Sequence, residues 1–207
     1  MKASARAQRE LGPRPRRGDP AETLARLTVA AARAFEEHGY FATDTNAIAR
    51  AAGYAPGTFY KHFEDKTDAF VAAYAWWVRE AWAGVDLAWA GKGEGASGAR
   101  AKARAAVLHV LSVHAAWPGF RRDLRHLAVS EPRVTKAFTE NRKAQLVRIV
   151  AVVGEGRRAE AFLLLLTIER TADALAMGEA TRMGVDVGAL TDALVADAQA
   201  LLVPSRP

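Results

Sequence analysis

Residues 43–66 constrain this chain most, because they hold two very short helical segments separated by a tight turn. Asp44 can cap the first helix by accepting from the backbone N–H groups that follow it, and Gly53 can supply the left-handed conformation that ends it. Pro56 suits the first position of a second helix, where its missing N–H costs nothing. The second helix has too little apolar surface to be stable alone, so its apolar side must pack on neighbouring helices. The stretch therefore predicts a helix-turn-helix, the layout of a DNA-reading module, with its second helix exposed.

Composition excludes several classes of protein. The chain of 207 residues is long enough for one large domain or two smaller ones, and its lack of cysteine excludes disulfides and thiolate metal sites. The N-terminus has no apolar signal region, and the longest apolar run, residues 69–78, is too short to cross a bilayer. We therefore expect a cytoplasmic protein that does not enter a membrane.

Positive charge is concentrated at the N-terminus. The net charge is +6, and residues 1–20 hold six basic residues against two acidic ones. Residues 21–66 hold five basic residues against six acidic ones, so the DNA-reading module itself is nearly neutral. We expect residues 1–20 to form a flexible basic arm that attracts phosphates; a solvated tail without a role is the alternative.

Apolar residues recur every three or four positions along most of the remaining chain, which is typical of helices. The pattern predicts helices over residues 21–38, 67–89, 98–116, 118–130, 132–153, 157–183 and 187–202. No segment alternates in polarity as a strand does, so the predicted fold class is all-α. Residues 91–98 are a flexible loop; a phosphate cradle, the alternative, lacks a preceding strand and the GK[ST] pattern.

The helix-turn-helix resembles the N-terminal domain of the TetR (tetracycline-repressor) family. The resemblance covers about residues 22–72 and rests on fixed spacings of Ala30 and Ala31, Phe35, Gly39 and Tyr40, Thr43, Ile48 and Ala49, Ala52 and Gly53, Gly57 and Thr58, Tyr60, His62 and Phe63, Lys66 and Phe70. Two positions depart from the family pattern: Asp44 replaces a second threonine, and Ala55 replaces the serine that caps the recognition helix. Pro56 can compensate for the missing cap by fixing the backbone.

The resemblance also indicates which residues contact DNA. Thr58, Tyr60 and His62 match the family's contact positions, while Lys61 and Lys66 are placed to meet phosphates. The full set expected to bind double-stranded DNA is Thr45, Asn46, Pro56, Gly57, Thr58, Tyr60, Lys61, His62 and Lys66.

The last two predicted helices require cover on more than one side. The first of them is apolar around most of its circumference, and the second carries Leu190, Leu194, Ala198 and Leu201 on one stripe. A homodimer with a four-helix interface would supply that cover, as the resemblance also implies, and would present two recognition helices to a palindromic operator. A core within one chain is the alternative.

A small-molecule site is a further expectation. Five tryptophans fall within 42 positions, beside several histidines, and such a set can line an apolar cavity between helices, although aromatic stripes are usually core. The resemblance implies a pocket of this kind. The residues expected to bind a small hydrophobic or aromatic ligand are Tyr74, Trp77, Trp82, His109, His114, Trp117, His126 and Arg170.

Catalysis is not indicated by the polar residues. His109 and His114 are five positions apart and so lie about 140° apart around a helix, which places them poorly for a shared metal ion. Glu169 and Asp173 flank Arg170, which favours an ion pair over acid–base chemistry. We therefore expect no metal, no cofactor and no enzymatic activity.

Taken together, these features predict a helix-turn-helix DNA-binding domain at residues 21–66 and a helical ligand-binding and dimerisation domain at residues 67–207. The expected function is that of a DNA-binding transcriptional regulator, a repressor released from its operator by a ligand. A regulator controlled by a protein partner, or by no effector, is the alternative. An all-helical enzyme is the third choice.

Overall fold

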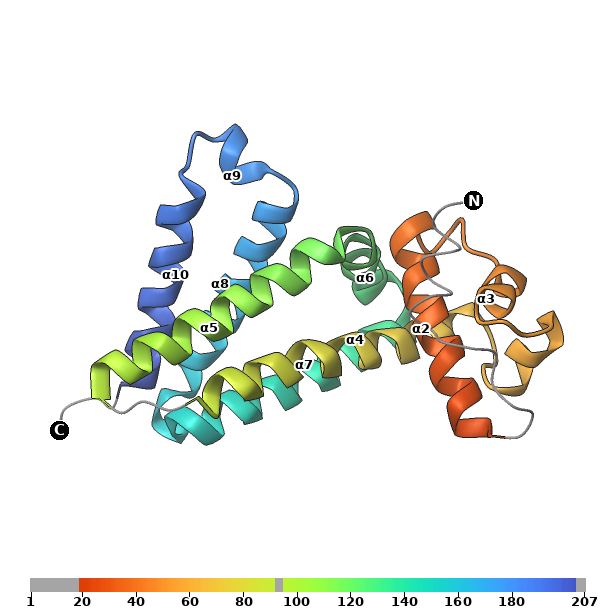
Figure 1. The fold of residues 1–207 in the computed structure, drawn as a ribbon, viewed down its shortest axis with the longest axis horizontal. Coiled ribbons are helices and arrows are strands. Elements are labelled where there is room, and N and C mark those ends of the chain that lie inside the picture. Colours follow the sequence, from red (N-terminus) through yellow and green to blue (C-terminus); the bar gives the residue numbers. More distant parts are fainter. Residues whose placement is uncertain (1–18, 92–94, 204–207) are drawn as a thin grey trace. The chain divides into compact units, whose positions relative to one another are not determined.

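The computed structural model describes residues 19–91 and 95–203. These residues fold into helices and contain no strand, which confirms the predicted all-α fold (Figure 1). The elements are α2 (Pro20–His38), α3 (Thr45–Ala51), the 3₁₀ helix η1 (Pro56–Lys61), α4 (Lys66–Trp89), α5 (Gly95–Ala116), α6 (Pro118–Ser130), α7 (Pro132–Val153), the 3₁₀ helix η2 (Glu155–Arg157), α8 (Arg158–Ala176), α9 (Glu179–Arg182) and α10 (Val187–Leu202). None of the helices in the described part of the chain has the length and apolar character needed to span a bilayer.

The chain divides into two compact units. The first comprises the described residues up to Val78 together with Gly119–Phe138, and the second comprises Arg79–Pro118 and the described residues from Thr139 onward. In the first unit α6 packs with α2. The expected boundary between a DNA-binding domain and a ligand-binding domain at residues 66 and 67 stays a prediction. The basic arm expected at residues 1–20 lies outside the described residues, apart from Asp19 and Pro20, which begin α2.

Most helix boundaries lie at the proline, capping and glycine residues that mark them in the sequence. Pro118 and Pro132 begin α6 and α7, and Asp186 caps α10 by accepting a hydrogen bond from the Ala189 N–H at 2.7 Å. The single helix predicted over residues 157–183 is wrong. Gly178 adopts a left-handed conformation, with φ +67°, and separates α8 from α9.

Aromatic rings form the core of the first unit. The ring of Phe70 in α4 lies 5.1 Å from that of Phe35 in α2 and stacks on that of Phe120 in α6 at 4.9 Å. All three side chains are fully buried. This cluster fastens α2 and α6 to the beginning of α4.

Two carboxylates join the ends of α2 and α6. Glu36 near the end of α2 accepts hydrogen bonds from the backbone N–H groups of Gly119 and Phe120, at 3.2 and 2.7 Å, and so caps the beginning of α6. In return, Asp123 of α6 accepts from the Tyr40 N–H at 2.5 Å, just beyond the end of α2. We call this pair of contacts the α2–α6 clasp. Gly119 is required within it, because a Cβ there would lie 2.4 Å from the Glu36 carbonyl oxygen.

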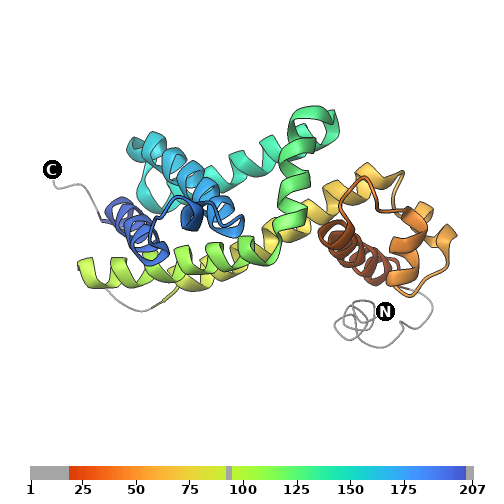
Figure 2. The same cartoon turned by 90° about the horizontal axis from the view of Figure 1, so that it is seen from above.

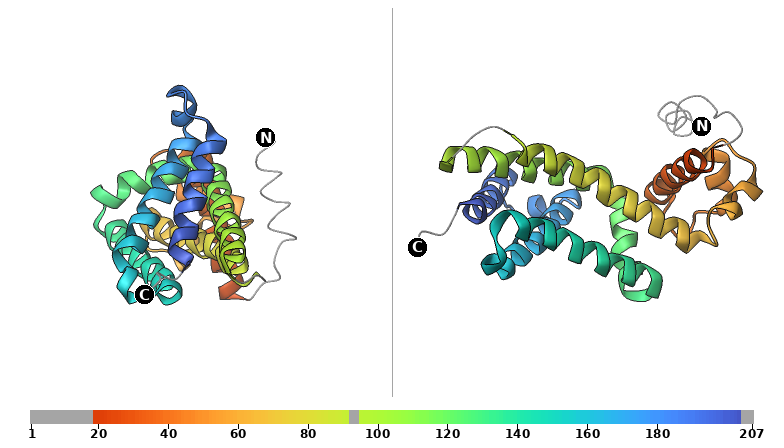
Figure 3. Two further views of the ribbon diagram at one scale, coloured as in Figure 1. Left: turned by 90° about the vertical axis from the view of Figure 1, so that its left-hand side faces the viewer. Right: turned by 90° about the horizontal axis from the view of Figure 1, so that it is seen from below.

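The second unit is built around α5, against which α8 and α10 pack (Figures 2 and 3). Ala103 and Val107 of α5 form a buried cluster with Leu194, Val195 and Ala198 of α10. The apolar stripe of α10 was expected at a dimer interface. In this cluster Leu194 and Ala198 of that stripe are instead buried within one chain. Helical periodicity shows that the stripe is buried but not which chain buries it.

Close packing between α4 and α5 depends on a glycine. The imidazole of His109 lies against Gly84, where an added Cβ would be 2.2 Å from the ring, and its Nε2 is 3.0 Å from the Ala81 carbonyl oxygen. Further along α4, the Arg148 guanidinium of α7 pairs with Asp86 and lies 4.7 Å from the centre of the Trp82 ring. These contacts attach the later part of α4 to α5 and α7.

Candidate DNA-binding surface

The first helix of the helix-turn-helix begins as predicted. The Asp44 carboxylate accepts from the Asn46 N–H at 2.8 Å and caps α3. After Ala51 the chain turns through Gly53, whose φ of +86° is the predicted left-handed conformation. The Tyr54 N–H then donates to the Ala49 carbonyl at 2.9 Å and closes the turn.

The expected recognition helix is the 3₁₀ helix η1. Pro56 occupies its first turn and Ala55 supplies no side-chain cap, as the departure from the family pattern predicts. The Thr58 N–H donates to the Ala55 carbonyl, three residues back, which is the 3₁₀ pattern. Beneath it, Phe59 and Phe63 are buried with their ring centres 5.2 Å apart. These rings fix η1 to the unit and direct its other side chains outward.

The residues expected to bind DNA are exposed or partly buried, and none of them is in the core. Asn46, Pro56, Gly57, Tyr60 and Lys61 are exposed, while Thr45, Thr58, His62 and Lys66 are partly buried. Eight of the nine residues expected to bind DNA thus lie in α3, in η1 or at the first position of α4, and His62 directly follows η1. Their contacts with DNA stay a prediction.

Tyr60 is held in place by the preceding helix. Its ring is 59% exposed, and its hydroxyl lies 2.9 Å from Thr45 Oγ1 of α3. This hydrogen bond joins the two helices of the motif through residues that are 15 positions apart. It restricts the phenol to one orientation before any partner binds.

Lys66 differs from Lys61 in its surroundings. Its ammonium donates to the carbonyl oxygens of Phe41 and Thr43, at 3.4 and 3.1 Å, and lies 4.6 Å from the centre of the Tyr40 ring. Lys66 therefore stabilises the loop between α2 and α3, and its expected contact with a phosphate stays a prediction. Lys61 is exposed on η1.

The structure adds Arg50 to the charged groups of this surface. Its guanidinium lies 3.6 Å from Asp44 Oδ2, and both side chains are more than half exposed. Partial neutralisation of Asp44 reduces the repulsion that this acid would exert on a phosphate. Sequence reasoning missed Arg50, although its six-residue separation from Asp44 across a single short helix is a visible signal.

The loop between η1 and α4 is fixed by a basic residue from α7. Arg133 donates to Asp65 Oδ2 at 2.6 Å and lies 3.9 Å from Glu64 Oε2. The hydrogen bond from Arg133 lowers the pKa of Asp65 below its ordinary value of 3.8, although partial burial opposes the shift. The acid remains ionised, so the pair persists at neutral pH.

The residues expected to bind a ligand are divided between the two units. Tyr74 and Trp77 are buried in the first unit, while Trp82, His109, His114 and Trp117 belong to the second. His126 and Arg170 lie on the surface. His126 contacts the Phe41 ring, with centres 5.7 Å apart, and Arg170 pairs with Glu179 at 2.7 Å.

Glu169 and Asp173 point to different helices. Glu169 pairs with Arg142 of α7, and Asp173 Oδ1 lies 3.8 Å from the His114 Nδ1 of α5. His109 bonds to α4 instead, so the two histidines of α5 do not converge. Within residues 19–91 and 95–203, no cluster of three or more potential metal-ligating side chains is present.

The helix-turn-helix matches a known family. Residues 27–73 match the model of the bacterial regulatory proteins of the tetR family. Residues 27–73 carry the DNA-binding domain of the TetR family. The match supports DNA-binding transcription regulation as the activity of this protein, and it places α3 and η1 in the segment that defines that domain.

Solved structures share the fold along most of the chain. A TetR-family regulator from Rhodococcus sp. is 18% identical with a TM-score of 0.65, and the match covers 88% of this chain and 100% of that one. A transcriptional regulator from Pseudomonas aeruginosa PAO1 is 18% identical with a TM-score of 0.67, covering 90% and 97%. The fatty acid degradation regulator FadR from Bacillus halodurans is 20% identical with a TM-score of 0.64, also covering 90% and 97%. No curated protein matches the sequence.

Proposed function

We propose that this protein is a homodimeric repressor that binds a palindromic operator and leaves it when a small molecule binds. The observation that carries the proposal is the outward-facing polar surface of α3 and η1, which is anchored from beneath by Phe59 and Phe63. Its hydroxyl, amide and amine groups suit the edges of bases and the phosphate oxygens of a DNA groove.

A second copy of the chain is the proposed cover for the outer faces of α8 and α10. On α8, Phe162, Leu163 and Leu166 are 40%, 64% and 43% exposed. On α10 the exposed residues include Ala189, Ala193, Ala196 and Ala200, spaced three or four apart. Large apolar side chains on one helix and small ones on the other allow helices of two chains to approach closely.

Dimerisation explains how a short recognition helix can bind tightly. Two copies related by a twofold axis present their recognition elements to two half-sites, and the second half-site binds as an intramolecular event. The operator is accordingly proposed to be a palindrome with half-sites about one helical turn apart, or a multiple of that.

Buried polar groups in the second unit support control by a ligand. His114 of α5 and Asp173 of α8 are only 4% and 7% exposed, and Gln145 of α7 is 8% exposed. The Gln145 Oε1 finds no hydrogen-bond partner within the described residues. A buried acceptor without a partner is costly in a purely structural core, and a ligand that donates a hydrogen bond would satisfy it.

Selection from a random pool of double-stranded DNA tests the operator. The full-length protein should enrich palindromic sites and bind them as two chains per site. Enrichment of sites without twofold symmetry would contradict the proposal.

Thermal-shift screening of metabolites then tests the ligand, because a compound at 100 times its dissociation constant stabilises the protein by about 2.7 kcal/mol. The stabilising compound should also release the selected DNA.

A further inference from the structure

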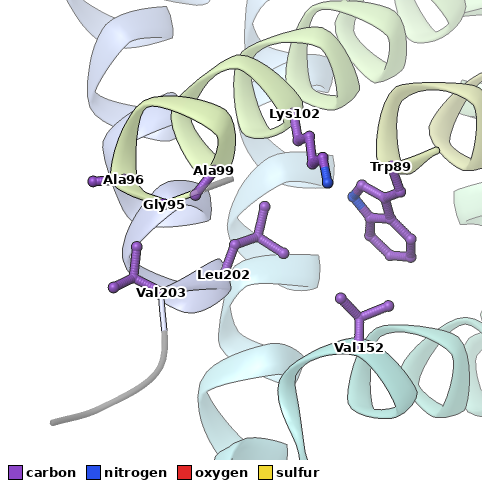
Figure 4. Close-up of a pocket in the computed structure, with 8 residues that line it drawn as sticks. All are labelled: Trp89, Gly95, Ala96, Ala99, Lys102, Val152, Leu202 and Val203. Carbon is purple, nitrogen blue, oxygen red and sulfur yellow. The ribbon is translucent and has the colours of Figure 1, made fainter. Parts of the chain in front are cut away.

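A pocket in the second unit is lined by none of the residues expected to bind a ligand. It has a volume of about 310 Å³ and is bounded by the end of α4, the first turns of α5, the end of α7 and the end of α10. Trp89, Val152 and Leu202 form apolar walls, and the Lys102 ammonium points toward Trp89 between them (Figure 4).

The walls of this pocket are held by contacts outside it. Gln199 Nε2 of α10 donates to the Ala96 carbonyl in the first turn of α5 at 3.3 Å. The Arg157 guanidinium donates to the carbonyl of Leu201 at 2.8 Å and to that of Val203 at 3.1 Å, so it fixes the end of α10. The Trp89 ring packs edge-on against Trp82, with centres 5.8 Å apart. The pocket is therefore largely formed before anything binds.

The pocket favours a negative charge. Lys102 is the charged residue of the lining, and none of the described residues forms a hydrogen bond or an ion pair with it. Gly95 and Ala96, which also line the pocket, begin the 22-residue helix α5, whose positive dipole end lies there. A partly buried ammonium beside a helix N-terminus attracts an anion, while the aromatic and aliphatic walls attract an apolar body.

We propose that this pocket binds a small monocarboxylate with a flat apolar body. The carboxylate meets the Lys102 ammonium, and the body packs on the Trp89 ring and the side chains of Val152 and Leu202. The volume is at the low end for ligand pockets, which limits the ligand to about the size of a fused two-ring acid. The site goes beyond the proposed function, since binding here requires neither DNA nor any residue expected to bind the releasing ligand.

Isothermal titration of the full-length protein with 2-naphthoate and with the neutral 2-naphthalenemethanol tests the site. The wild-type protein should bind the acid about tenfold more tightly than the alcohol. Lys102→Gln should abolish this preference by weakening binding of the acid about tenfold, and Lys102→Arg should retain most of it. Arg100→Gln removes an exposed charge from the same helix outside the pocket and should change neither affinity.

Equal affinity of the wild-type protein for the acid and the alcohol would overturn the proposal, as would undiminished binding of the acid to Lys102→Gln. Ala99→Phe fills the pocket and should prevent binding of both probes, provided that its circular dichroism matches that of the wild type. Operator affinity without probe is measured in parallel. A variant that no longer binds 2-naphthoate but retains its operator affinity would separate this site from the proposed repressor function.

Discussion

Gly53 and Gly57 stand four positions apart in the helix-turn-helix, and their backbones differ. Gly53 has a φ of +86°, which side chains rarely adopt, whereas Gly57 is not among the glycines with positive φ. A Cβ built at either position meets no other atom within 4 Å. Of these two positions, the fold requires glycine only at Gly53. At Gly57 no contact within the described residues requires glycine, and we propose that a DNA backbone approaches there.

The two substitutions to alanine should thus have opposite effects. Gly57→Ala should leave the melting temperature unchanged or slightly higher, and should weaken operator binding roughly tenfold because the phosphate is displaced. Gly53→Ala should lower the stability by about 1–2 kcal/mol through its strained conformation. Thermal unfolding and fluorescence anisotropy with the selected operator measure the two quantities. Full operator affinity of folded Gly57→Ala would exclude Gly57 from the contact surface.

Tyr60→Phe should weaken operator binding by about 0.5–1.5 kcal/mol without unfolding the protein, because it removes one exposed hydroxyl. Thr45→Val removes the partner of that hydroxyl and is expected to have a similar effect. If the hydrogen bond acts by orienting the phenol, the double variant should bind no worse than either single one. Additive losses in anisotropy would show that the two hydroxyls contact DNA separately.

The pair of Asp65 and Arg133 makes stability depend on acidity. Because the pKa of Asp65 is lowered in the folded chain, the pair stabilises the fold above the ordinary value of 3.8 and loses this effect as the pH falls through the lowered value. Arg133→Gln should lower the melting temperature at pH 7 by a few degrees at most, since both side chains are nearly half exposed. The difference from the wild type should narrow below pH 4. A pH-independent difference would assign the loss to packing.

The contact of α4 with α5 restricts side-chain size, because Gly84 leaves room for the His109 ring. Gly84→Ala should destabilise the protein by about 1–3 kcal/mol through overpacking. Adding His109→Ala should recover much of that loss by removing the ring that the methyl group meets. Thermal unfolding of both single variants and the double variant measures the coupling. A Gly84→Ala protein of unchanged stability would mean that the ring moves aside without cost.

Much of the helical layout was predictable because local residues determine it. Pro118, Pro132 and Asp186 mark helix starts whatever packs on them, so α6, α7 and α10 have the expected boundaries. Gly178 was missed because a glycine inside an apolar pattern is often tolerated. The 3₁₀ form of η1 was also missed, since a six-residue segment without a side-chain cap has no periodicity to distinguish it.

Long-range contacts were not predictable. Glu36 and Phe120 are 84 positions apart, and no local pattern indicates that a glutamate caps a distant helix. The residues of the candidate DNA surface could be proposed from sequence because they are close together in the chain. The residues of the pocket around Lys102 come from the ends of four separate helices. Leu194 shows the same limit, because its burial was evident but its partner in α5 was not.

For the assembled regulator, the exposed stripe of α8 provides a clear test of dimerisation. Leu163→Glu places a charge on the face proposed to meet a second chain, and should give a folded monomer that binds the operator weakly. Leu87→Glu is the matched control, since Leu87 is 76% exposed on α4, and it should remain dimeric. Sedimentation velocity measures the mass. A dimeric Leu163→Glu protein would locate the interface elsewhere.

Leu194→Glu should behave differently from Leu163→Glu. Leu194 is 3% exposed inside the core shared by α5 and α10, so an unpaired carboxylate there should unfold the second unit. Circular dichroism should show that Leu194→Glu has less helix than the wild type. This measurement comes first, because a change in mass is informative only for a folded variant. Retained helix content would contradict the core position of Leu194.

The α2–α6 clasp has a consequence for how the first unit opens. The N–H groups of Tyr40, Gly119 and Phe120 are each held by a carboxylate from the opposite helix, so none can reach solvent while the two helices remain joined. Their amide hydrogens should therefore exchange with deuterium at a common rate, although Tyr40 is about eighty positions away along the chain. Glu36→Gln, which weakens one half of the clasp, should accelerate exchange at Tyr40 as well as at the two amides it contacts.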